Sequence, residues 1–261
     1  MYSEKKAFQT LKNYLKQHQI DSFPQDVAIL GTGWNQAVDP STIEMELGYQ
    51  ELFGVQATVP GHDGRLIIAV IGKTKVAAMV GRFHRYEGYT SRQATLPIRV
   101  FAQAGAKRLL LTAASGALNE KYQVGDFVIT SDLLTLFLPD SPLEGPQFLD
   151  LSEAFSWEMR KKLRAVALEL DLPVREGIYA YYHGPNFETP ADKMALKFLG
   201  GDVVGMSTVP ETIMARWLKL EVASLSFVTN LAFVKHDHQE VLAAAKQSSQ
   251  KMVELLTRFY S

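Results

Sequence analysis

The chain has 261 residues, of which 47% are hydrophobic, and a chain of this length can bury a large core. Lysine and arginine number 27 against 28 acidic residues, and the formal net charge of -1 excludes a global field that would hold a nucleic acid. Cysteine is absent, which excludes disulfides, thiolate metal sites and a cysteine nucleophile. No stretch approaches the roughly 18 apolar residues of a spanning helix, so we expect no membrane partner and a cytoplasmic location.

The first predicted elements are a surface helix and a buried strand. Apolar residues recur at three- and four-residue spacing over residues 4–19, and lysines occupy the other face, which is typical of an amphipathic helix. The apolar run 27–30 then stops at Gly31-Thr32-Gly33. This pattern predicts a buried strand that ends in a tight loop.

Further short apolar runs predict strands that are covered on both faces, because they are aliphatic or β-branched and rarely alternate strictly with polar residues. These runs lie at 66–71, 75–80, 108–112, 127–130, 176–182, 202–205 and 221–229. The turn at residues 72–75 joins two of them and indicates a hairpin, so we expect a mixed sheet.

Helical patterns alternate with most of these runs. They lie at 91–104, 152–171, 189–199, 208–219 and 238–259. Thr189 before Pro190 is typical of an N-cap followed by the first helical residue, and Thr208 with Glu211 fits a capping box.

The order of these elements predicts an α/β fold. We expect a single domain over residues 1–261, with three α/β/α layers around a mixed central sheet. Residues 137–150 contain three prolines and form the one long loop in this scheme.

Residue types that can carry chemistry follow several of the predicted strands. The hydroxyl and amides at Thr32 could bind a phosphate, although a simple tight turn is an equal interpretation. Arg82, His84 and Tyr86 follow a buried strand, where an arginine fork can bind an oxyanion. Because α/β sheets bind ligands at the carboxyl ends of strands, we favour function over a solvated loop. Three more such loops lie at 112–116, 184–189 and 205–208.

Other site types find little support in the sequence. The Gly31 turn lacks the third glycine of a dinucleotide fingerprint, and neither a G-x-x-x-x-G-K-[ST] phosphate loop nor a G-x-S-x-G nucleophile turn is present. His236 and His238 could share a metal ion, but no third ligand stands at recognisable spacing. We therefore expect no metal site and no cofactor.

Together, these segments resemble the trimeric purine nucleoside phosphorylase family, which also includes methylthioadenosine phosphorylases. The resemblance rests on strings that occur in family order from about residue 26 onward. They are TVPGHDGRL at 58–66, GRFHRYEGY at 81–89, GPNFET at 184–189, VGMSTVPE at 204–211 and VLAA at 241–244. The resemblance implies the nucleoside phosphorylase fold and phosphorolysis of purine nucleosides, with inorganic phosphate as co-substrate.

The family pattern implies a phosphate site at five positions. The matching groups are Thr32, Arg82, His84, Ser207 and the backbone amide of Ala114. They would hold the dianion beneath the sugar, in line with the glycosidic bond.

The family pattern also implies ribose contacts. Positions that touch the sugar in the family are matched by Tyr86, Met206 and Tyr179, and His62 matches a loop histidine near the phosphate and sugar. His238 matches the residue that reaches the 5′-hydroxyl, which counts against a methylthio substrate.

The purine site implied by the resemblance consists of Phe187, Glu188, Thr229 and Asn230. A carboxylate at Glu188 accepts N–H bonds from N1 and the 2-amino group, whereas adenine has no N1 proton. Asn230 can bridge O6 and N7 and stabilise the departing base. We therefore expect 6-oxopurine substrates, with Asn230, His84 and Glu188 as the catalytic residues.

Family active sites lie at subunit boundaries, which implies a homotrimer in which Phe148 covers the neighbour's sugar. The chain departs from the family at Ala113, where asparagine is usual, and in residues 131–150. A xanthosine- or methylthioinosine-preferring phosphorylase on the same scaffold stays an alternative. A non-catalytic nucleoside-binding protein is a second alternative, disfavoured because a binder has no evident need for a phosphate site.

Overall fold

The computed structural model describes residues 1–34, 37–56, 58, 63–146, 148–234, 243–244 and 246–261. In this part of the chain, nine strands form one mixed sheet in the order β2-β3-β4-β1-β5-β8-β7-β6-β9. Strand β9 also pairs with β5, so one half of the sheet closes on itself. The expected mixed α/β architecture is confirmed, and the closure is a feature that a flat three-layer scheme does not contain.

The strands are β1 (Asp26–Leu30), β2 (Ile43–Gly48), β3 (Arg65–Ile71), β4 (Thr74–Val80), β5 (Arg108–Ala117), β6 (Phe127–Leu134), β7 (Val174–Tyr181), β8 (Val203–Gly205) and β9 (Glu221–Leu231). The helices are α1 (Glu4–Gln17), α2 (Tyr49–Phe53), α3 (Ser91–Ala94), α4 (Leu96–Ala104), α5 (Trp157–Glu169), α6 (Pro190–Phe198), α7 (Val209–Trp217) and α9 (Ser249–Phe259), with short 3-10 turns η1 (Pro40–Thr42) and η2 (Arg85–Glu87).

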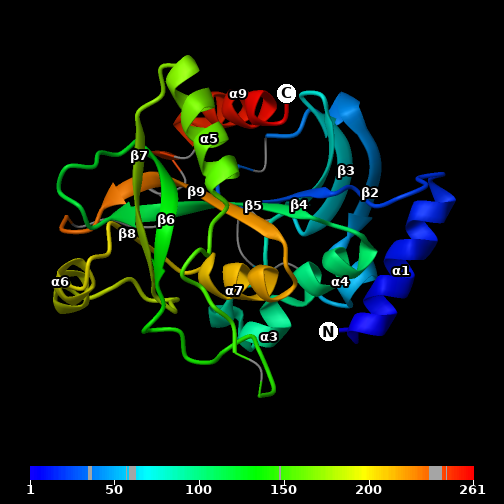
Figure 1. The fold of residues 1–261 in the computed structure, drawn as a ribbon, viewed down its shortest axis with the longest axis horizontal. Coiled ribbons are helices and arrows are strands. Elements are labelled where there is room, and N and C mark those ends of the chain that lie inside the picture. Colours follow the sequence, from blue (N-terminus) through cyan, green and yellow to red (C-terminus); the bar gives the residue numbers. More distant parts are fainter. Residues whose placement is uncertain (35–36, 57, 59–62, 147, 235–242, 245) are drawn as a thin grey trace.

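Helices cover both faces of the sheet, as the unbroken apolar strands predict. All five residues of β1 are buried. Val27 and Ile29 pack into a core cluster with α1, α4 and α7, whereas Ala28 and Leu30 pack into a second cluster with α5 and α9. Figure 1 shows α5 and α9 on one side of the strands and α4 and α7 on the other. A strand buried on both faces has no polar side to expose, which explains its continuous hydrophobic run.

The hairpin predicted at residues 72–75 is confirmed, since β3 and β4 pair antiparallel across it. The predicted helix caps also form. The hydroxyl of Thr189 accepts from the backbone amide of Asp192 at the start of α6, and Thr208 and Glu211 form a capping box on α7.

Three predicted helices differ from the observed ones. The stretch 91–104 is two helices, α3 and α4, because Pro97 has no amide hydrogen and cannot continue the hydrogen-bond ladder of α3. The predicted helix 152–171 begins only at Trp157, where Ser156 caps it. In the predicted helix 238–259, the described residues 243–244 and 246–247 are helical, and a separate helix, α9, begins at Ser249.

Two elements were missed. Strand β2 alternates exposed and buried residues at the edge of the sheet, and its glutamates hide the pattern of a buried strand. The short helix α2 then closes on Gly54 in the left-handed conformation. Both lie on the β3 side of the sheet, away from the strands that carry most of the candidate residues.

Candidate active site

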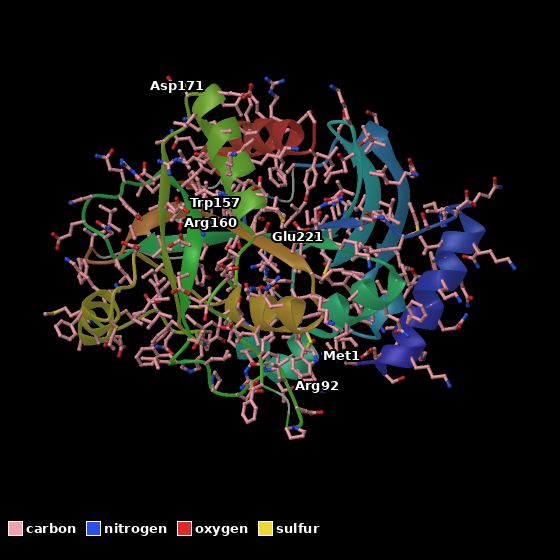
Figure 2. The ribbon with its side chains drawn as sticks, viewed as in Figure 1. Met1, Arg92, Trp157, Arg160, Asp171 and Glu221 are labelled. Carbon is pink, nitrogen blue, oxygen red and sulfur yellow. The ribbon has the colours of Figure 1, made fainter. Side chains whose placement is uncertain are left out.

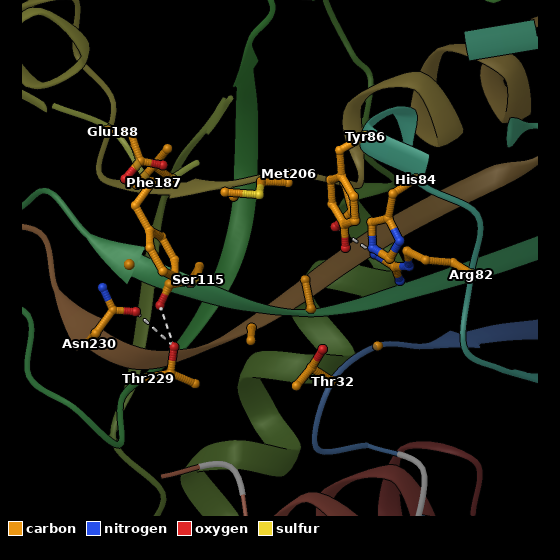
Figure 3. Close-up of a pocket in the computed structure, with 17 residues that line it drawn as sticks. Thr32, Arg82, His84, Tyr86, Ser115, Phe187, Glu188, Met206, Thr229 and Asn230 are labelled. Carbon is orange, nitrogen blue, oxygen red and sulfur yellow. Dashed lines mark hydrogen bonds between the residues drawn. The ribbon is translucent and has the colours of Figure 1, made fainter. Parts of the chain in front are cut away.

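A cavity lies at the ends of β1, β4, β7, β8 and β9 and runs along β5 (Figure 3). It brings together eleven residues that the sequence singled out, although they come from segments up to about 200 positions apart. The lining residues are Gly31, Thr32, Arg82, His84, Tyr86, Ala113, Ala114, Ser115, Gly116, Phe187, Glu188, Val204, Gly205, Met206, Ser207, Thr229 and Asn230. Strands β1, β4, β5 and β9 run parallel, so their carboxyl ends meet at one edge of the sheet. Strands β7 and β8 run in the opposite direction, and β8 reaches the cavity because it pairs with the end of β5 at Gly116 and Ala117.

Arg82 is fixed at one end of this cavity by contacts on several of its nitrogens. One terminal nitrogen donates to Oγ of Ser207 at 2.7 Å. The other donates to the backbone carbonyls of Thr112 at 2.5 Å and Ile29 at 3.3 Å, which tethers the guanidinium to β5 and β1. Arg82 is only 2% exposed, so its positive charge is held in a low-dielectric setting that an oxyanion can match.

Glu211 lies behind this arginine and balances its charge. Its Oε1 is 3.5 Å from Nε of Arg82, and its Oε2 accepts from the backbone amide of Thr208 at 2.7 Å. Thr208 has a φ of 69°, a left-handed conformation that is strained for a threonine. Glu211 therefore supports both the arginine and the turn that carries Ser207.

His84 is oriented by a second carboxylate. Glu87 Oε1 lies 3.0 Å from the ring Nδ1 of His84 and accepts from the His84 backbone amide at 2.7 Å. The carboxylate favours hydrogen on Nδ1, which leaves Nε2 as the second polar atom of the ring. The ring stacks on Tyr86 with centroids 4.6 Å apart. Burial lowers the pKa of His84 below its usual value, so the unliganded ring is neutral at pH 7.

Thr32 and Ala114 complete this end of the cavity. After β1, the chain can approach β5 this closely only because residue 31 is glycine. A Cβ at that position would come within 2.6 Å of the Thr112 carbonyl oxygen. The Gly31 amide donates to Oγ1 of Thr112 at 3.1 Å. This turn brings Thr32 beside the Ala114 region of β5, where both residues line the cavity.

An amide and a hydroxyl from β9 line the other end. Oγ1 of Thr229 lies 3.0 Å from Oδ1 of Asn230 and 3.3 Å from the carbonyl oxygen of Ser115, so its one hydrogen can be given to either oxygen. Gly116 pairs with Asn230 where the β5–β9 register shifts, and a Cβ on Gly116 would come within 3.0 Å of Asn230 Nδ2. The glycine therefore makes room for the amide group.

Phe187 and Glu188 enter from the segment after β7. Glu188 is buried and Phe187 is 38% exposed, so an aromatic face and a carboxylate meet at the cavity beside Asn230. Figure 3 shows these residues at one side of the view, Arg82, His84 and Tyr86 at the other, and Met206 between them. The cavity thus has a cationic end and an end with a carboxylate and an amide.

Comparison with known proteins supports the resemblance to the purine nucleoside phosphorylase family. The family model of the Phosphorylase superfamily matches residues 35–261. Purine nucleoside phosphorylase of Bos taurus is 36% identical over 96% of this chain and 92% of its own length. The Mycobacterium tuberculosis protein of the same name is 44% identical over 88% of this chain and 87% of its own. The chain belongs to the purine nucleoside phosphorylase family.

A solved structure agrees with this membership. Schistosoma mansoni purine nucleoside phosphorylase in complex with inosine superposes with a TM-score of 0.85 at 33% identity, over 98% of this chain and 94% of the other. The family and the nucleoside phosphorylase fold predicted from the sequence motifs are therefore confirmed.

Tyr179 does not line the cavity as the family pattern predicts. Its ring is fully buried beneath the Gly205–Ser207 turn, and a Cβ on Gly205 would come within 2.1 Å of the Tyr179 hydroxyl. That hydroxyl lies 3.4 Å from Oγ of Ser207. In this structure, Tyr179 supports a predicted phosphate ligand and does not present a surface to a sugar.

Of the three further predicted ribose residues, the structure describes only Phe148. Phe148 is 99% exposed and does not line the cavity. His62 and His238 lie outside the described residues, as does the candidate metal pair that includes His236. Among the residues that are described, no group of three histidine, aspartate or glutamate side chains could hold a metal ion, and no helix is long and apolar enough to cross a membrane.

Two supporting carboxylates were missed by sequence reasoning. Glu87 stands within a string that carried the family resemblance, three residues after His84, but no role was assigned to it. Glu211 was interpreted only as a cap. A glutamate three residues after the candidate ligand His84 is a signal that would have found Glu87, whereas Glu211 follows the cap Thr208, which is not a candidate ligand.

Replacing Glu211 with glutamine is expected to lower the free energy of unfolding by about 3 kcal/mol, because a buried arginine then lacks its counter-charge. Chemical denaturation without phosphate measures the effect. Glu120→Gln is the control, since Glu120 pairs with Lys197 at the solvent-exposed surface, where such a pair contributes little to stability. Equal losses for the two variants would contradict the supporting role of Glu211.

Proposed function

We propose that this chain catalyses the reversible phosphorolysis of the 6-oxopurine nucleosides inosine and guanosine. The products are the free purine and α-ribose 1-phosphate, or the deoxy sugar phosphate from deoxynucleosides. The observation that carries the proposal is that Arg82 and Ser207 open into the same cavity as Glu188 and Asn230. One end suits a phosphate and the other suits a purine, so the bond that must break lies between them.

The proposed phosphate site uses charge, hydroxyls and an amide. Arg82 supplies the positive charge, and Thr32, Ser207 and the backbone amide of Ala114 supply directional donors. His84 offers Nε2, and an approaching dianion favours the protonated ring, which opposes the effect of burial on its pKa. Phosphate held in this way attacks C1′ from the face opposite the base, which inverts the configuration at that carbon.

Breaking the C1′–N9 bond leaves positive character on the ribosyl group and negative charge on the purine. Groups that are fixed beforehand at these two places stabilise the transition state more than the ground state. The phosphate stabilises the ribosyl cation. Asn230, whose amide oxygen is beside the Thr229 hydroxyl, stabilises the purine at O6 and N7 as N7 gains a proton. The reaction therefore needs no cofactor beyond the phosphate co-substrate.

In this proposal, Glu188 is the residue that selects the purine base. A buried carboxylate accepts hydrogen bonds from the N1 proton of hypoxanthine or guanine, and an adenine base would leave it without that donor. Phe187 would stack on the purine and fix its plane. Met206, which lies between the two ends (Figure 3), and Tyr86, which stacks on His84, would contact the ribose.

The remaining assignments stay predictions. His62 and His238 would reach the sugar from segments outside the described residues. Phe148 would cover the sugar of a neighbouring subunit in a homotrimer, and its full exposure in the single chain is compatible with that role. A single domain and a cytoplasmic location are likewise proposed from the sequence.

Replacing Glu188 with alanine is expected to lower kcat/KM for inosine and guanosine by at least about 100-fold, because the bound base loses its hydrogen-bond partner. Adenosine turnover should change by less than about tenfold, since adenine has no N1 proton to donate. Initial rates with inosine, guanosine, xanthosine, adenosine and methylthioinosine measure the selectivity.

The matched control for this experiment is Glu169→Ala, which removes an exposed glutamate on α5 that pairs with Arg258. It should leave all five rates unchanged. Equal losses for inosine and adenosine in Glu188→Ala would contradict base selection by Glu188, and a wild-type preference for xanthosine or methylthioinosine would replace the proposed substrate class.

A further inference from the structure

Outside the cavity, one carboxylate connects two segments that are far apart in the sequence. Asp140 belongs to the proline-rich segment 137–150, and its Oδ1 lies 2.9 Å from Nε of Arg85. The same carboxylate accepts from the backbone amide and from the hydroxyl of Ser91, each at 2.9 Å. Ser91 is fully buried. The two oxygens of Asp140 are therefore held by two hydrogen bonds from Ser91 and by the ion pair with Arg85.

Arg85 stands directly between two residues that line the cavity. His84 and Tyr86 stack on each other and face the site, whereas Arg85 does not line it. The Arg85 guanidinium contacts Asp140 and also donates to the backbone carbonyl of Tyr89. Because Arg85 and Tyr86 belong to η2 and His84 is its N-cap, a contact that fixes Arg85 also limits how His84 and Tyr86 can move.

Segment 137–150 is itself fixed to the body of the protein. Arg92 in α3 pairs with Glu144 at 3.2 Å. Three leucines of the segment, and one directly after it, pack against a buried cluster that includes Tyr179 and Tyr181. These leucines are Leu138, Leu143, Leu149 and Leu151. Figure 1 shows the chain between β6 and α5 passing close to α3, and Figure 2 labels Arg92 at that edge of the molecule. These contacts hold the described residues of the segment, 137–146 and 148–150, against the rest of the protein.

We propose that Asp140 is a positioning residue for phosphate binding, which acts through Arg85 and Ser91 on the segment that carries His84 and Tyr86. The inference rests on the proposed function for the identity of the anion. It extends that function by making phosphate affinity depend on segment 137–150, which also carries Phe148.

The chemistry of the carboxylate explains why an amide cannot replace it. Asp140 accepts from both donors of Ser91 and forms an ion pair with Arg85, and an ionised carboxylate has two accepting oxygens. An asparagine has one accepting oxygen and an NH2 group that would face a donor. The variant Asp140→Asn therefore loses the charge and turns one hydrogen bond into a donor–donor contact.

The test compares Asp140→Asn, Arg85→Gln and the double variant with wild type. Calorimetric titration with inorganic phosphate gives the phosphate Kd, and steady-state rates give kcat and the KM values. We expect each single variant to raise the phosphate Kd about tenfold, with kcat at saturating phosphate within about twofold of wild type. The double variant should lose clearly less phosphate affinity than the product of the two single losses, because both substitutions break the Arg85–Asp140 contact.

Hydrogen exchange supplies a readout that does not depend on catalysis. Backbone amides of residues 84–90 should exchange faster in Asp140→Asn than in wild type. Asp150→Asn is the matched control, because Asp150 lies in the same segment but does not contact Arg85. Its carboxylate accepts from the Ser152 hydroxyl at 2.6 Å and from the Ser152 backbone amide at 2.8 Å. Asp140→Glu keeps the charge and should recover most of the phosphate affinity if Asp140→Asn folds poorly.

An unchanged phosphate Kd in Asp140→Asn, with unchanged exchange over residues 84–90, would overturn the proposal even if the variant melted at a lower temperature. The proposal would also be overturned if the double variant lost phosphate affinity by the product of the two single losses, because the two residues would then act independently. Failure of wild type to cleave any nucleoside would instead overturn the proposed function, since the phosphate titration and the exchange still decide the role of Asp140.

Discussion

Replacing Asn230 with alanine is expected to lower kcat/KM for inosine by about 100- to 1000-fold, the usual effect of removing one preorganised donor at a developing charge. The amide lies at the cavity beside Gly116, with its oxygen 3.0 Å from the Thr229 hydroxyl, so it is already oriented in the free protein. Since the charge on the purine develops during bond cleavage, most of the loss should appear in kcat.

The natural control for that experiment is Asn13→Ala. Asn13 accepts a hydrogen bond from Gln9 on the exposed face of α1, far from the cavity. Steady-state kinetics with inosine at saturating phosphate measure both variants. A loss that appeared only in KM would show that Asn230 binds the ground state and would contradict its role in stabilising the departing base.

Replacing Arg82 with lysine is expected to weaken phosphate binding by about 100-fold or more, although the positive charge is kept. The guanidinium donates at once to Ser207 and to the carbonyls of Thr112 and Ile29, and an ammonium on a flexible stem cannot reproduce that planar fork. One buried carbonyl is then left without its donor, so the variant should also be less stable.

Phosphate titration and the dependence of rate on phosphate concentration measure the Arg82→Lys variant. Arg108→Lys is a matched control, because Arg108 also uses a two-nitrogen fork, to Asp26 at 2.7 Å, but does not line the cavity. Wild-type phosphate affinity in Arg82→Lys would show that charge alone suffices and that the fixed geometry is irrelevant.

The parts of the fold that follow from local patterns could be predicted. Unbroken apolar runs such as β1 predicted strands buried on both faces, and Thr189 and Thr208 predicted helix starts. Strand β2 was not predicted, because two of its six residues are glutamates that face outward at the sheet edge. The break between α3 and α4 shows that one proline inside a helical pattern divides a helix.

The site was predictable where strand-end loops carry unusual chemistry. Arg82, His84 and Ser207 were chosen on such loops and on family strings, and Asn230 was chosen from the family pattern at the end of the last strand. The structure brings all four to one cavity. The positioning groups were not predictable, because they depend on packing between distant segments. Tyr179 lies beneath Gly205 only because that residue has no Cβ, and the pairing of Asp140 with Arg85 joins residues 55 positions apart.

The central claim is tested most directly by inosine turnover with and without inorganic phosphate, with hypoxanthine release and ribose 1-phosphate both assayed. The account predicts cleavage only when phosphate is present, with one ribose 1-phosphate formed for each hypoxanthine released. Cleavage at the same rate without phosphate, with free ribose as the product, would contradict it and would remove the roles given to Arg82, His84 and Ser207.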